Sequence, residues 1–332
     1  MIACPLSLDS IPRLVLGHFP TPLMPMPRLQ AELGVKHPIW IKHDDYSGPG
    51  FGGNKVRKLE YELAAARAAG ATDVLTTGGL RSNHCRITAA LAAQLGFACH
   101  LVLNGVEPAR DSAEPASHWL DTMYGARVHY VARGQDRAPA LAALADDLRR
   151  EGRQAYVIPL GASTPLGACG FVRAVLELKQ QCEGPGFAPA AILHSTSSAG
   201  TQAGLAAGLR LAGWDQVKLI GISADDSTAA ISAEVRRILS GLEPLLGLGQ
   251  GDLAVPIHVD DGFTGPGYGI PSPEGTAAIE LLARCEGVVL DPVYTSKAMA
   301  GLLALLPSLP PGPVVFWHTG GQLALFSSTG GD

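Results

Sequence analysis

The sequence predicts an α/β fold with two open, twisted, mainly parallel sheets in two domains. Short apolar or β-branched runs alternate with helical segments along almost the whole chain, and such alternation requires parallel crossover connections. The runs are more numerous than one twisted sheet usually holds. A length of 332 residues with 47% hydrophobic residues also favours about two domains, which leaves a cleft between them as the expected place for a ligand.

Ten runs are predicted as strands, each bounded by turn residues. They are PIWIKH (38–43), DVLTT (73–77), ACHLVLN (98–104), RVHYV (127–131), AYVIP (155–159), AILHS (191–195), KLIGIS (218–223), PIHVD (256–260), VVLD (288–291) and VVFWH (314–318). Helices are predicted between them, including 55–69 and 84–95, where apolar residues recur at helical spacing.

Composition excludes several classes of function. The net charge is −5 and only 17% of residues are charged, so no basic field indicates a nucleic-acid partner. No apolar run is long enough to cross a membrane, and prolines and acids interrupt residues 1–20, unlike a secretory signal; we expect a cytoplasmic protein. The six cysteines form no C-x-x-C pair, so we expect reduced thiols and no metal site.

The stretch GPGFGGNKVRKLE (48–60) crowds four glycines directly before Asn54 and Lys55. Glycines gather where a backbone bends sharply or approaches something closely, so the loop presents the lysine. Gly48, Gly50 and Gly53 also match G-x-G-x-x-G, the dinucleotide fingerprint of a dehydrogenase. That match is weak because four residues separate the preceding strand from the first glycine.

Ligands of open α/β sheets bind at the carboxyl ends of the strands, and four of these loops carry chemistry. After 73–77, Ser82 and Asn83 open a helix, as an ordinary N-cap or as a site for a substrate carboxylate. After 191–195, TSSAGTQAGL (196–205) leads into a helix, again as a plain cap or as a phosphate site. Thr319 follows 314–318.

Two tyrosines stand at loop apices. Tyr294 and Thr295 follow the predicted strand 288–291, and Tyr268 lies in GPGYG. Tyrosines at such positions are commonly half-buried with a bonded hydroxyl, yet a pair of them favours a functional site.

A lysine on a glycine loop, a phosphate-binding helix start and a carboxylate-binding helix start together suggest pyridoxal phosphate. The chain resembles the D-cysteine desulfhydrase and 1-aminocyclopropane-1-carboxylate deaminase family over nearly its whole length. The segments that carry the resemblance are PTPLMPMPRLQAELG (20–34), IWIKHDDYSGPGFGGNKVRKLE (39–60), GGLRSNHCRITAALAAQLG (78–96), GTQAGL (200–205), GPGYGIPSPEG (265–275), EGVVLDPVYTSKAMAGL (286–302) and FWHTGG (316–321).

The resemblance implies the tryptophan-synthase-β-like fold, fold type II of these enzymes, with a small amino-acid substrate and a homodimeric assembly. Residues 1–56 and 165–332 would form the larger, cofactor-binding domain, and 57–164 a smaller α/β domain inserted within it. Lys55 would bind the cofactor aldehyde and then act as base at the substrate Cα. Lys58 would lie near the phosphate.

Matching further residues to the family motifs assigns the rest of the site. The loop of Ser198, Ala199, Gly200 and Thr201 would hold the phosphate. Asn83 would bind the phenolic oxygen of the cofactor, and Ser82 with the adjoining His84 would face the substrate. Tyr268 and Tyr294 would flank the substrate and assist proton transfer.

Substrate choice is expected at the pyridine nitrogen. The deaminase branch has a glutamate where this chain has Thr295, which leaves the hydroxyl of Thr319 as the partner of the ring. A neutral hydroxyl does not hold that nitrogen protonated, and the weaker electron sink suits α,β-elimination. D-cysteine is therefore the first expected substrate, giving pyruvate, ammonia and sulfide.

Arg81 departs from the glutamine usual in the family and raises a second possibility, an acidic substrate such as L-cysteate, if its guanidinium faces inward. The phosphate loop, SSAG, also departs from the family's usual glycines. Deamination of 1-aminocyclopropane-1-carboxylate, β-replacement of the cysteine-synthase type and a non-catalytic cofactor-binding homologue are the remaining alternatives.

Overall fold

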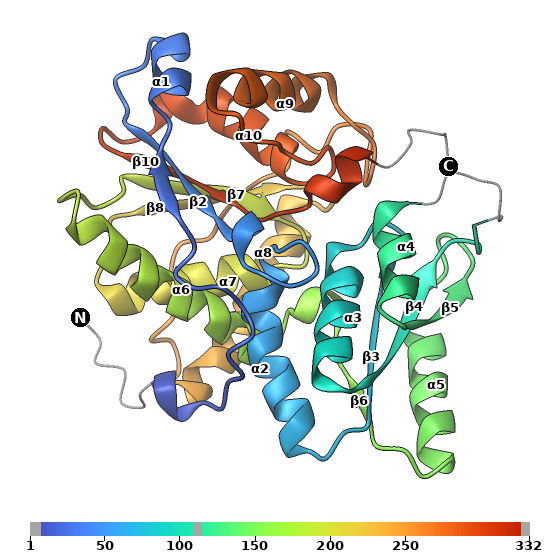
Figure 1. The fold of residues 1–332 in the computed structure, drawn as a ribbon. Helices are drawn as coiled ribbons and strands as arrows, with labels where there is room; N and C mark the ends of the chain where they lie inside the picture. The colour runs from blue at the N-terminus through green and yellow to red at the C-terminus, as the bar shows by residue number, and fades with distance from the viewer. Residues whose placement is uncertain (1–7, 109–114, 327–332) are drawn as a thin grey trace.

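The protein is described by a computed structural model covering residues 8–108 and 115–326. Two sheets are present (Figure 1). The six-stranded sheet has the order β1-β2-β10-β7-β8-β9 and the four-stranded sheet the order β5-β4-β3-β6. Every pairing is parallel except that of β1 with β2. The predicted fold class is therefore confirmed.

The strands are β1 (Leu23–Pro25), β2 (Ile39–His43), β3 (Asp73–Gly79), β4 (Ala98–Asn104), β5 (Arg127–Val131), β6 (Ala155–Val157), β7 (Ala191–Thr196), β8 (Lys218–Ser223), β9 (His258–Asp260) and β10 (Val314–His318). The helices are α1 (Pro27–Leu33), α2 (Lys55–Ala68), α3 (Asn83–Leu95), α4 (Ala116–Met123), α5 (Ala138–Arg150), α6 (Pro165–Glu183), α7 (Gly200–Ala212), α8 (Thr228–Leu245), α9 (Pro273–Glu286) and α10 (Thr295–Leu305).

Both faces of the larger sheet are covered, as a parallel sheet requires. Figure 1 shows α1, α9 and α10 on one face and α6, α7 and α8 on the other. The strand β10 illustrates the alternation: Val315 and Trp317 join the core under α6–α8, whereas Val314 and Phe316 join the core under α9 and α10. The buried strand is thus a continuous apolar run.

Nine of the ten predicted strands are present, and the strand predicted at 288–291 is wrong. These residues run as irregular chain, because β10 is already paired with β2 on one side and β7 on the other. The carbonyl of Val289 accepts a hydrogen bond from the ring of His318 instead. The short edge strand β1 was not predicted; its Pro25 is tolerated at an edge.

The strands of the two sheets come from different parts of the chain. The four strands of the small sheet lie within residues 73–157, between β2 and β7 of the larger one. The helix α2 packs against α6, where the Cα of Gly170 approaches so closely that an added Cβ would lie 2.2 Å from the carbonyl oxygen of Arg57. The limits at 56/57 and 164/165 stay a prediction.

A buried ionic network anchors the start of α2 to the larger sheet. The guanidinium of Arg57 donates to both carboxylate oxygens of Asp44 at 2.9 Å and to both oxygens of Glu177 at 2.9 Å. Lys42 also donates to Glu177, and Thr21 donates to Asp44. With its charges paired and its hydrogen bonds made, the network fixes the first turn of α2.

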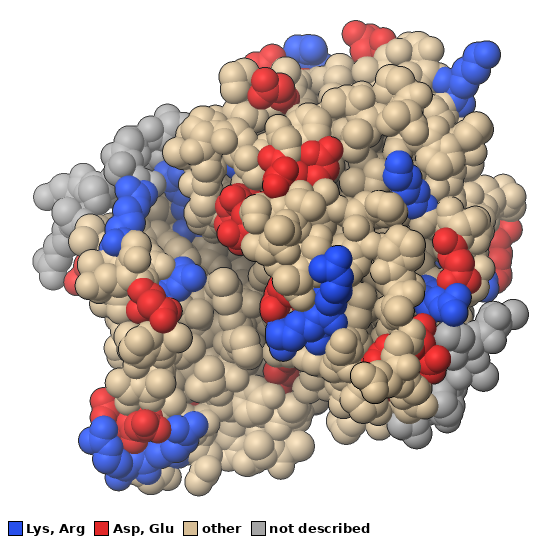
Figure 2. Space-filling view, turned by 180° about the vertical axis from the view of Figure 1, so that it is seen from behind, with Lys and Arg blue, Asp and Glu red and all other residues tan. Residues whose placement is uncertain are grey.

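Three further observations concern surface charge, membrane helices and cysteines. Figure 2 shows basic and acidic side chains interspersed on one face, without a large area of either sign. Within residues 8–108 and 115–326, no helix is long and apolar enough to cross a membrane. The five cysteines in the described part of the chain have free thiols, and Cys85 is buried on α3.

Candidate active site

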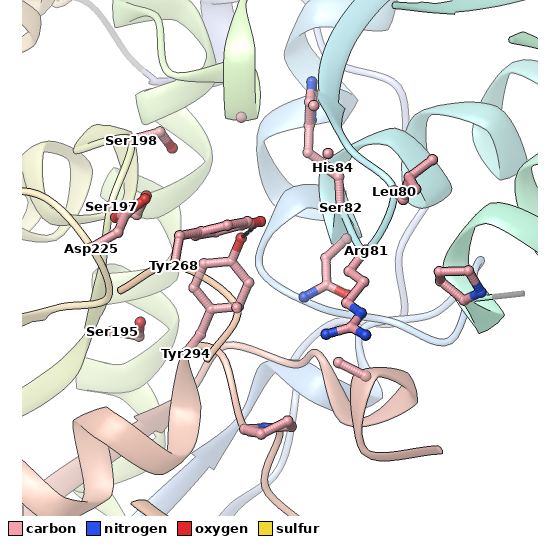
Figure 3. Close-up of a pocket in the computed structure, with 18 of the residues that line it drawn as sticks. Leu80, Arg81, Ser82, His84, Ser195, Ser197, Ser198, Asp225, Tyr268 and Tyr294 are labelled. Carbon is pink, nitrogen blue, oxygen red and sulfur yellow. Dashed lines mark hydrogen bonds between the residues drawn. The ribbon is translucent and has the colours of Figure 1, made fainter. Parts of the chain in front are cut away.

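The carboxyl ends of β3, β7, β8 and β10 open onto one large cavity between the two sheets. Loops from both sheets line it, and Figure 3 shows side chains from the two sides facing across it. A cleft at strand ends is the predicted position of the site.

The glycine loop before Lys55 is shaped by close backbone contacts. Gly52 has a φ of 65°, and a Cβ at this position would lie 2.1 Å from the carbonyl oxygen of Asp45. The N–H of Gly53 donates to the carbonyl of Asp44, and the N–H of Asn54 donates to the carbonyl of Thr319 at the end of β10. The loop therefore delivers Lys55 to the cavity at the first position of α2.

The Lys55 amine is held by a short chain of hydrogen bonds. Its Nζ donates to Asn54 Oδ1 at 2.9 Å, and Asn54 Nδ2 donates to Thr201 Oγ1 at 3.0 Å. Burial lowers the pKa of Lys55 from 10.5 to about 8. At pH 7 about one amine in ten is then unprotonated, against about one in three thousand at the ordinary pKa, so this lysine is prepared for nucleophilic chemistry.

The start of α7 forms a cradle suited to an anion. Ala199 adopts the left-handed conformation, and the first turn of the helix carries amides without intrahelical partners. Beneath it, Lys58 Nζ donates to Ser163 Oγ at 3.2 Å, and Ser163 Oγ donates to Ser198 Oγ at 2.8 Å. A Cβ on Gly200 would lie 2.9 Å from Lys58 Nζ, so glycine leaves the space beside this ammonium open.

The start of α3 orients two polar residues. Ser82 is the N-cap and accepts a hydrogen bond from the N–H of Cys85 at 3.2 Å. Asn83 Oδ1 accepts from Arg86 at 2.5 Å, which leaves its Nδ2 as the donor available to a ligand. Both the capping role and a ligand-binding role are compatible with this geometry.

His84 is held in one tautomer. The hydroxyl of Thr76 donates to the carbonyl of Ile158, so His84 Nε2 must donate to that hydroxyl, at 2.7 Å. Burial, with the nearby Lys55 and Lys58, keeps the pKa of His84 well below its usual range. Its ring is neutral and turned toward β3.

Tyr268 and Tyr294 meet at the opposite wall. Their hydroxyl oxygens are 2.6 Å apart, and the rings pack edge to face with centroids 6.0 Å apart (Figure 3). Desolvation raises the pKa of Tyr294 well above 10 and raises that of Tyr268 as well, less strongly because Tyr268 is 44% exposed. Both phenols therefore remain protonated at neutral pH.

The cavity unites most of the site residues predicted from the sequence. The predicted residues that line it are Lys55, Arg81, Ser82, Asn83, His84, Ser198, Ala199, Thr201, Tyr268, Tyr294 and Thr319. The structure does not bring Lys58, Gly200 or Thr295 to its wall. Gly200 is the first residue of α7, and Lys58 lies beside it behind the cradle.

Thr295, which the sequence assigns to cofactor binding, does not line the cavity. Its hydroxyl donates to Asp291 Oδ1 at 2.7 Å and accepts from the N–H of Asp291 at 2.8 Å, with the side chain fully buried. Asp291 also accepts from the N–H groups of Val293 and Tyr294. Thr295 thus helps to shape the turn that presents Tyr294.

Sequence reasoning missed several residues of the cavity wall. Asp225 follows β8 beside Ser197 (Figure 3), and burial raises the pKa of its carboxyl. Ser195 and Thr196, at the end of β7, have buried hydroxyl oxygens without a protein partner among the described residues. The strand-end rule that singled out the neighbouring loops would have found Asp225 as well.

Pyridoxal phosphate fits this set of residues. The lysine amine is the group that binds its aldehyde, and the cradle at α7 suits its phosphate. Gly161 maintains the cradle, since a Cβ there would lie 2.3 Å from Ser198 Oγ. The unpartnered hydroxyls of Ser195 and Thr196 supply further donors. No group of three or more His, Cys, Asp or Glu side chains suited to a metal occurs among residues 8–108 and 115–326.

Comparison with known proteins agrees with this geometry. The family model described as "Pyridoxal-phosphate dependent enzyme" matches residues 14–320. A D-cysteine desulfhydrase from Klebsiella pneumoniae is 40% identical, with 97% of each chain covered. One from Salmonella newport is 40% identical, covering 96% of this chain and 97% of that protein.

Two solved structures are similar to this chain. The crystal structure of an ACC deaminase homologue superposes with a TM-score of 0.86 at 34% identity, covering 95% of this chain and 93% of that one. A fungal L-serine ammonia-lyase from Rhizomucor miehei, at 22% identity and a TM-score of 0.63, covers 93% of this chain and 94% of its own, and shares the fold.

The fold and the lysine-centred cavity define a pyridoxal-phosphate-dependent enzyme of fold type II, and the expected cofactor and fold are confirmed. Within that class, the chain belongs to the D-cysteine desulfhydrase and 1-aminocyclopropane-1-carboxylate deaminase family.

Proposed function

We propose that the protein catalyses α,β-elimination from D-cysteine, with water consumed and pyruvate, ammonia and hydrogen sulfide released. The observation that carries this proposal is the placement of Lys55 in one cavity with the α7 cradle and the tyrosine pair. The 40% identity to D-cysteine desulfhydrases over nearly the whole chain supports the choice of substrate.

Bound pyridoxal phosphate supplies an electron-accepting ring that stabilises negative charge at the substrate Cα. Lys55 Nζ removes the proton from Cα, for which its pKa of about 8 is well matched to neutral pH. Ser82 and the amides of the α3 start bind the substrate carboxylate. Ser198 and Thr201 would hold the cofactor phosphate, with Lys58 behind them bonded to Ser163.

The tyrosine pair acts on the leaving group. Tyr268 and Tyr294 share a hydrogen bond 2.6 Å long, and both remain protonated at neutral pH. One phenol donates its proton to the departing sulfur while the other stabilises the phenolate that forms. Elimination thus proceeds with the protons supplied inside the cavity.

Thr319 favours elimination over cyclopropane opening. Its place on the cavity wall supports a hydroxyl partner for the pyridine nitrogen. Thr295 is neutral and its hydroxyl is bonded to Asp291, so position 295 offers no carboxylate to the ring. The expectation drawn from the neutral hydroxyl, a weaker electron sink, is retained.

The test combines visible absorption with sulfide release in one cuvette. Purified holoenzyme is given D-cysteine, and pyruvate and sulfide are assayed at equal times. We expect the cofactor band to shift as sulfide and pyruvate appear in equal amounts, and Lys55→Ala to abolish both. A yellow protein that releases no sulfide, or full activity in Lys55→Ala, would contradict the proposal.

An acidic β-substituted amino acid such as L-cysteate is the second candidate. The supporting observation is that Arg81 lines the cavity and faces it in Figure 3. Guanidinium pairs well with a sulfonate or carboxylate. The Arg81→Gln substitution tests this candidate. A fall in activity on L-cysteate relative to D-cysteine supports an acidic substrate. Unchanged relative rates contradict it and leave D-cysteine as the single proposed substrate.

The remaining properties follow from the resemblance. The enzyme is proposed to be cytoplasmic and homodimeric. Light scattering of the purified holoenzyme tests the dimer by its mass. Product analysis with an added thiol separates elimination from β-replacement. A non-catalytic homologue would bind the cofactor and turn over none of these amino acids.

A further inference from the structure

Lys297 is a fully buried lysine on α10 that does not line the cavity. Its Nζ donates to three backbone carbonyl oxygens, those of Ala224 at 2.8 Å, Thr264 at 2.7 Å and Gly267 at 3.0 Å. An ammonium group has three N–H donors, so every donor has a partner. Burying a charged ammonium costs free energy, so the position of Lys297 calls for an explanation.

The three carbonyls belong to the segments that carry the cavity wall. Gly267 immediately precedes Tyr268, and Ala224 immediately precedes Asp225. Lys297 itself lies three residues after Tyr294, on the first turn of α10. One ammonium therefore joins the ends of three chain segments that meet at the tyrosine pair.

Apart from Lys297, the loop that carries Tyr268 is held mainly near its start, where Asp261 accepts from Thr228 and Thr264, and by a local hydrogen bond from Ile270 to Gly267. It runs without helix or strand from residue 261 to residue 272, with Gly265, Gly267 and Gly269 all at positive φ. Glycine gives a loop many alternative conformations. The two bonds from Lys297 to Thr264 and Gly267 fix it on the side away from the cavity.

We propose that Lys297 is a positioning residue that sets the distance between the hydroxyls of Tyr268 and Tyr294. The proposal rests on the proton-donating role of this pair in the proposed function. Lys297 touches neither substrate nor cofactor. It acts by holding the backbone on either side of the pair, so that the 2.6 Å hydrogen bond forms without further ordering of the loop.

The first test measures the loop directly and needs no turnover. Hydrogen–deuterium exchange is compared between holoenzyme and Lys297→Met, which keeps the side-chain length and removes the ammonium. We expect exchange of the 262–272 peptide to rise by about tenfold or more while peptides of α3 and α7 stay unchanged. Lys179→Met is the matched control, because Lys179 Nζ donates to the single carbonyl of Ala212 away from the cavity.

The second test is a double-mutant cycle in turnover. Lys297→Met is expected to lower kcat by about 30-fold with KM changed less than about threefold. In a Tyr268→Phe background, the same substitution should lower kcat by less than about threefold, because the hydroxyl that it positions is absent. If Lys297 only stabilised the fold, the reductions in kcat caused by the two substitutions would multiply in the double variant.

Each outcome decides the proposal. Unchanged exchange of the 262–272 peptide, or multiplying effects in the cycle, overturns it. If Lys297→Met does not fold, Lys297→Gln replaces it; its amide donates to two of the three carbonyls, and an intermediate rise in exchange is expected. If the parent enzyme releases no sulfide, the proposed function fails, while the exchange experiment still judges the role of Lys297.

Discussion

The lowered pKa of Lys55 makes a quantitative prediction for how the apoenzyme captures its cofactor. Only the unprotonated amine attacks the aldehyde, so the capture rate should rise with pH and reach its half-maximum near pH 8. The Asn54→Asp substitution places a carboxylate where Asn54 Oδ1 now lies, 2.9 Å from Lys55 Nζ.

The size of the effect follows from Coulomb's law. Two unit charges at this separation attract by about 6 kcal/mol at an effective dielectric constant of about 20. Desolvation of the new carboxylate offsets much of this energy. We therefore expect the pKa of Lys55 to rise by about one to two units, which slows capture at pH 7 by about 10- to 100-fold.

The assay is stopped-flow absorbance of apoenzyme mixed with pyridoxal phosphate between about pH 6 and pH 10, a range that brackets both the lowered and the ordinary lysine pKa. Asn54→Ala is the control, because it removes the hydrogen bond without adding a charge. A free lysine derivative corrects for ionisation of the cofactor itself. The reasoning is refuted if the parent midpoint lies near the ordinary value of 10.5, or if Asn54→Asp and Asn54→Ala have the same midpoint.

Three further predictions concern stability and the cradle. Arg57→Met leaves Asp44 charged and unpaired, and urea denaturation should show a loss of about 3–5 kcal/mol; a loss below about 1 kcal/mol would mean that the network contributes little. Gly161→Ala directs a methyl group at Ser198 Oγ, 2.3 Å away, and should weaken cofactor binding at least about tenfold in fluorescence titration, whereas unchanged affinity would place the phosphate elsewhere. Asp291→Asn replaces an acceptor by an amide and should destabilise the protein by about 2 kcal/mol in the same urea assay, and full stability would show that these hydrogen bonds are readily replaced.

The sequence was most informative where one physical effect dominated. Continuous apolar runs flanked by turn residues predicted β7 and β10, because runs of that length are typical of strands buried on both faces. It misled at 288–291, where a β-branched run follows α9 but its neighbour β10 is already paired on both sides. The spacing of apolar residues indicates which residues are buried. It does not specify which strand their backbone groups bond to.

The site shows the same limit. Glycines and strand ends predicted that Lys55 and Thr319 face one cleft, since both signals are local. Two partners of Lys297, Thr264 and Ala224, lie far earlier in the chain. No local pattern encodes such contacts, because a lysine would look the same on any buried helix.

The pairing of β2 with β10 has a consequence for synthesis. The small sheet uses strands from residues 73–157 only and is complete early, whereas β2 must wait for residues 314–318 to find its central neighbour. Ribosomes add about 5–20 residues per second, so β2 spends many seconds without that partner. The lysine pocket is therefore complete only after nearly the entire polypeptide has been synthesised, and nascent chains that stop short of β10 lack the wall that carries Thr319.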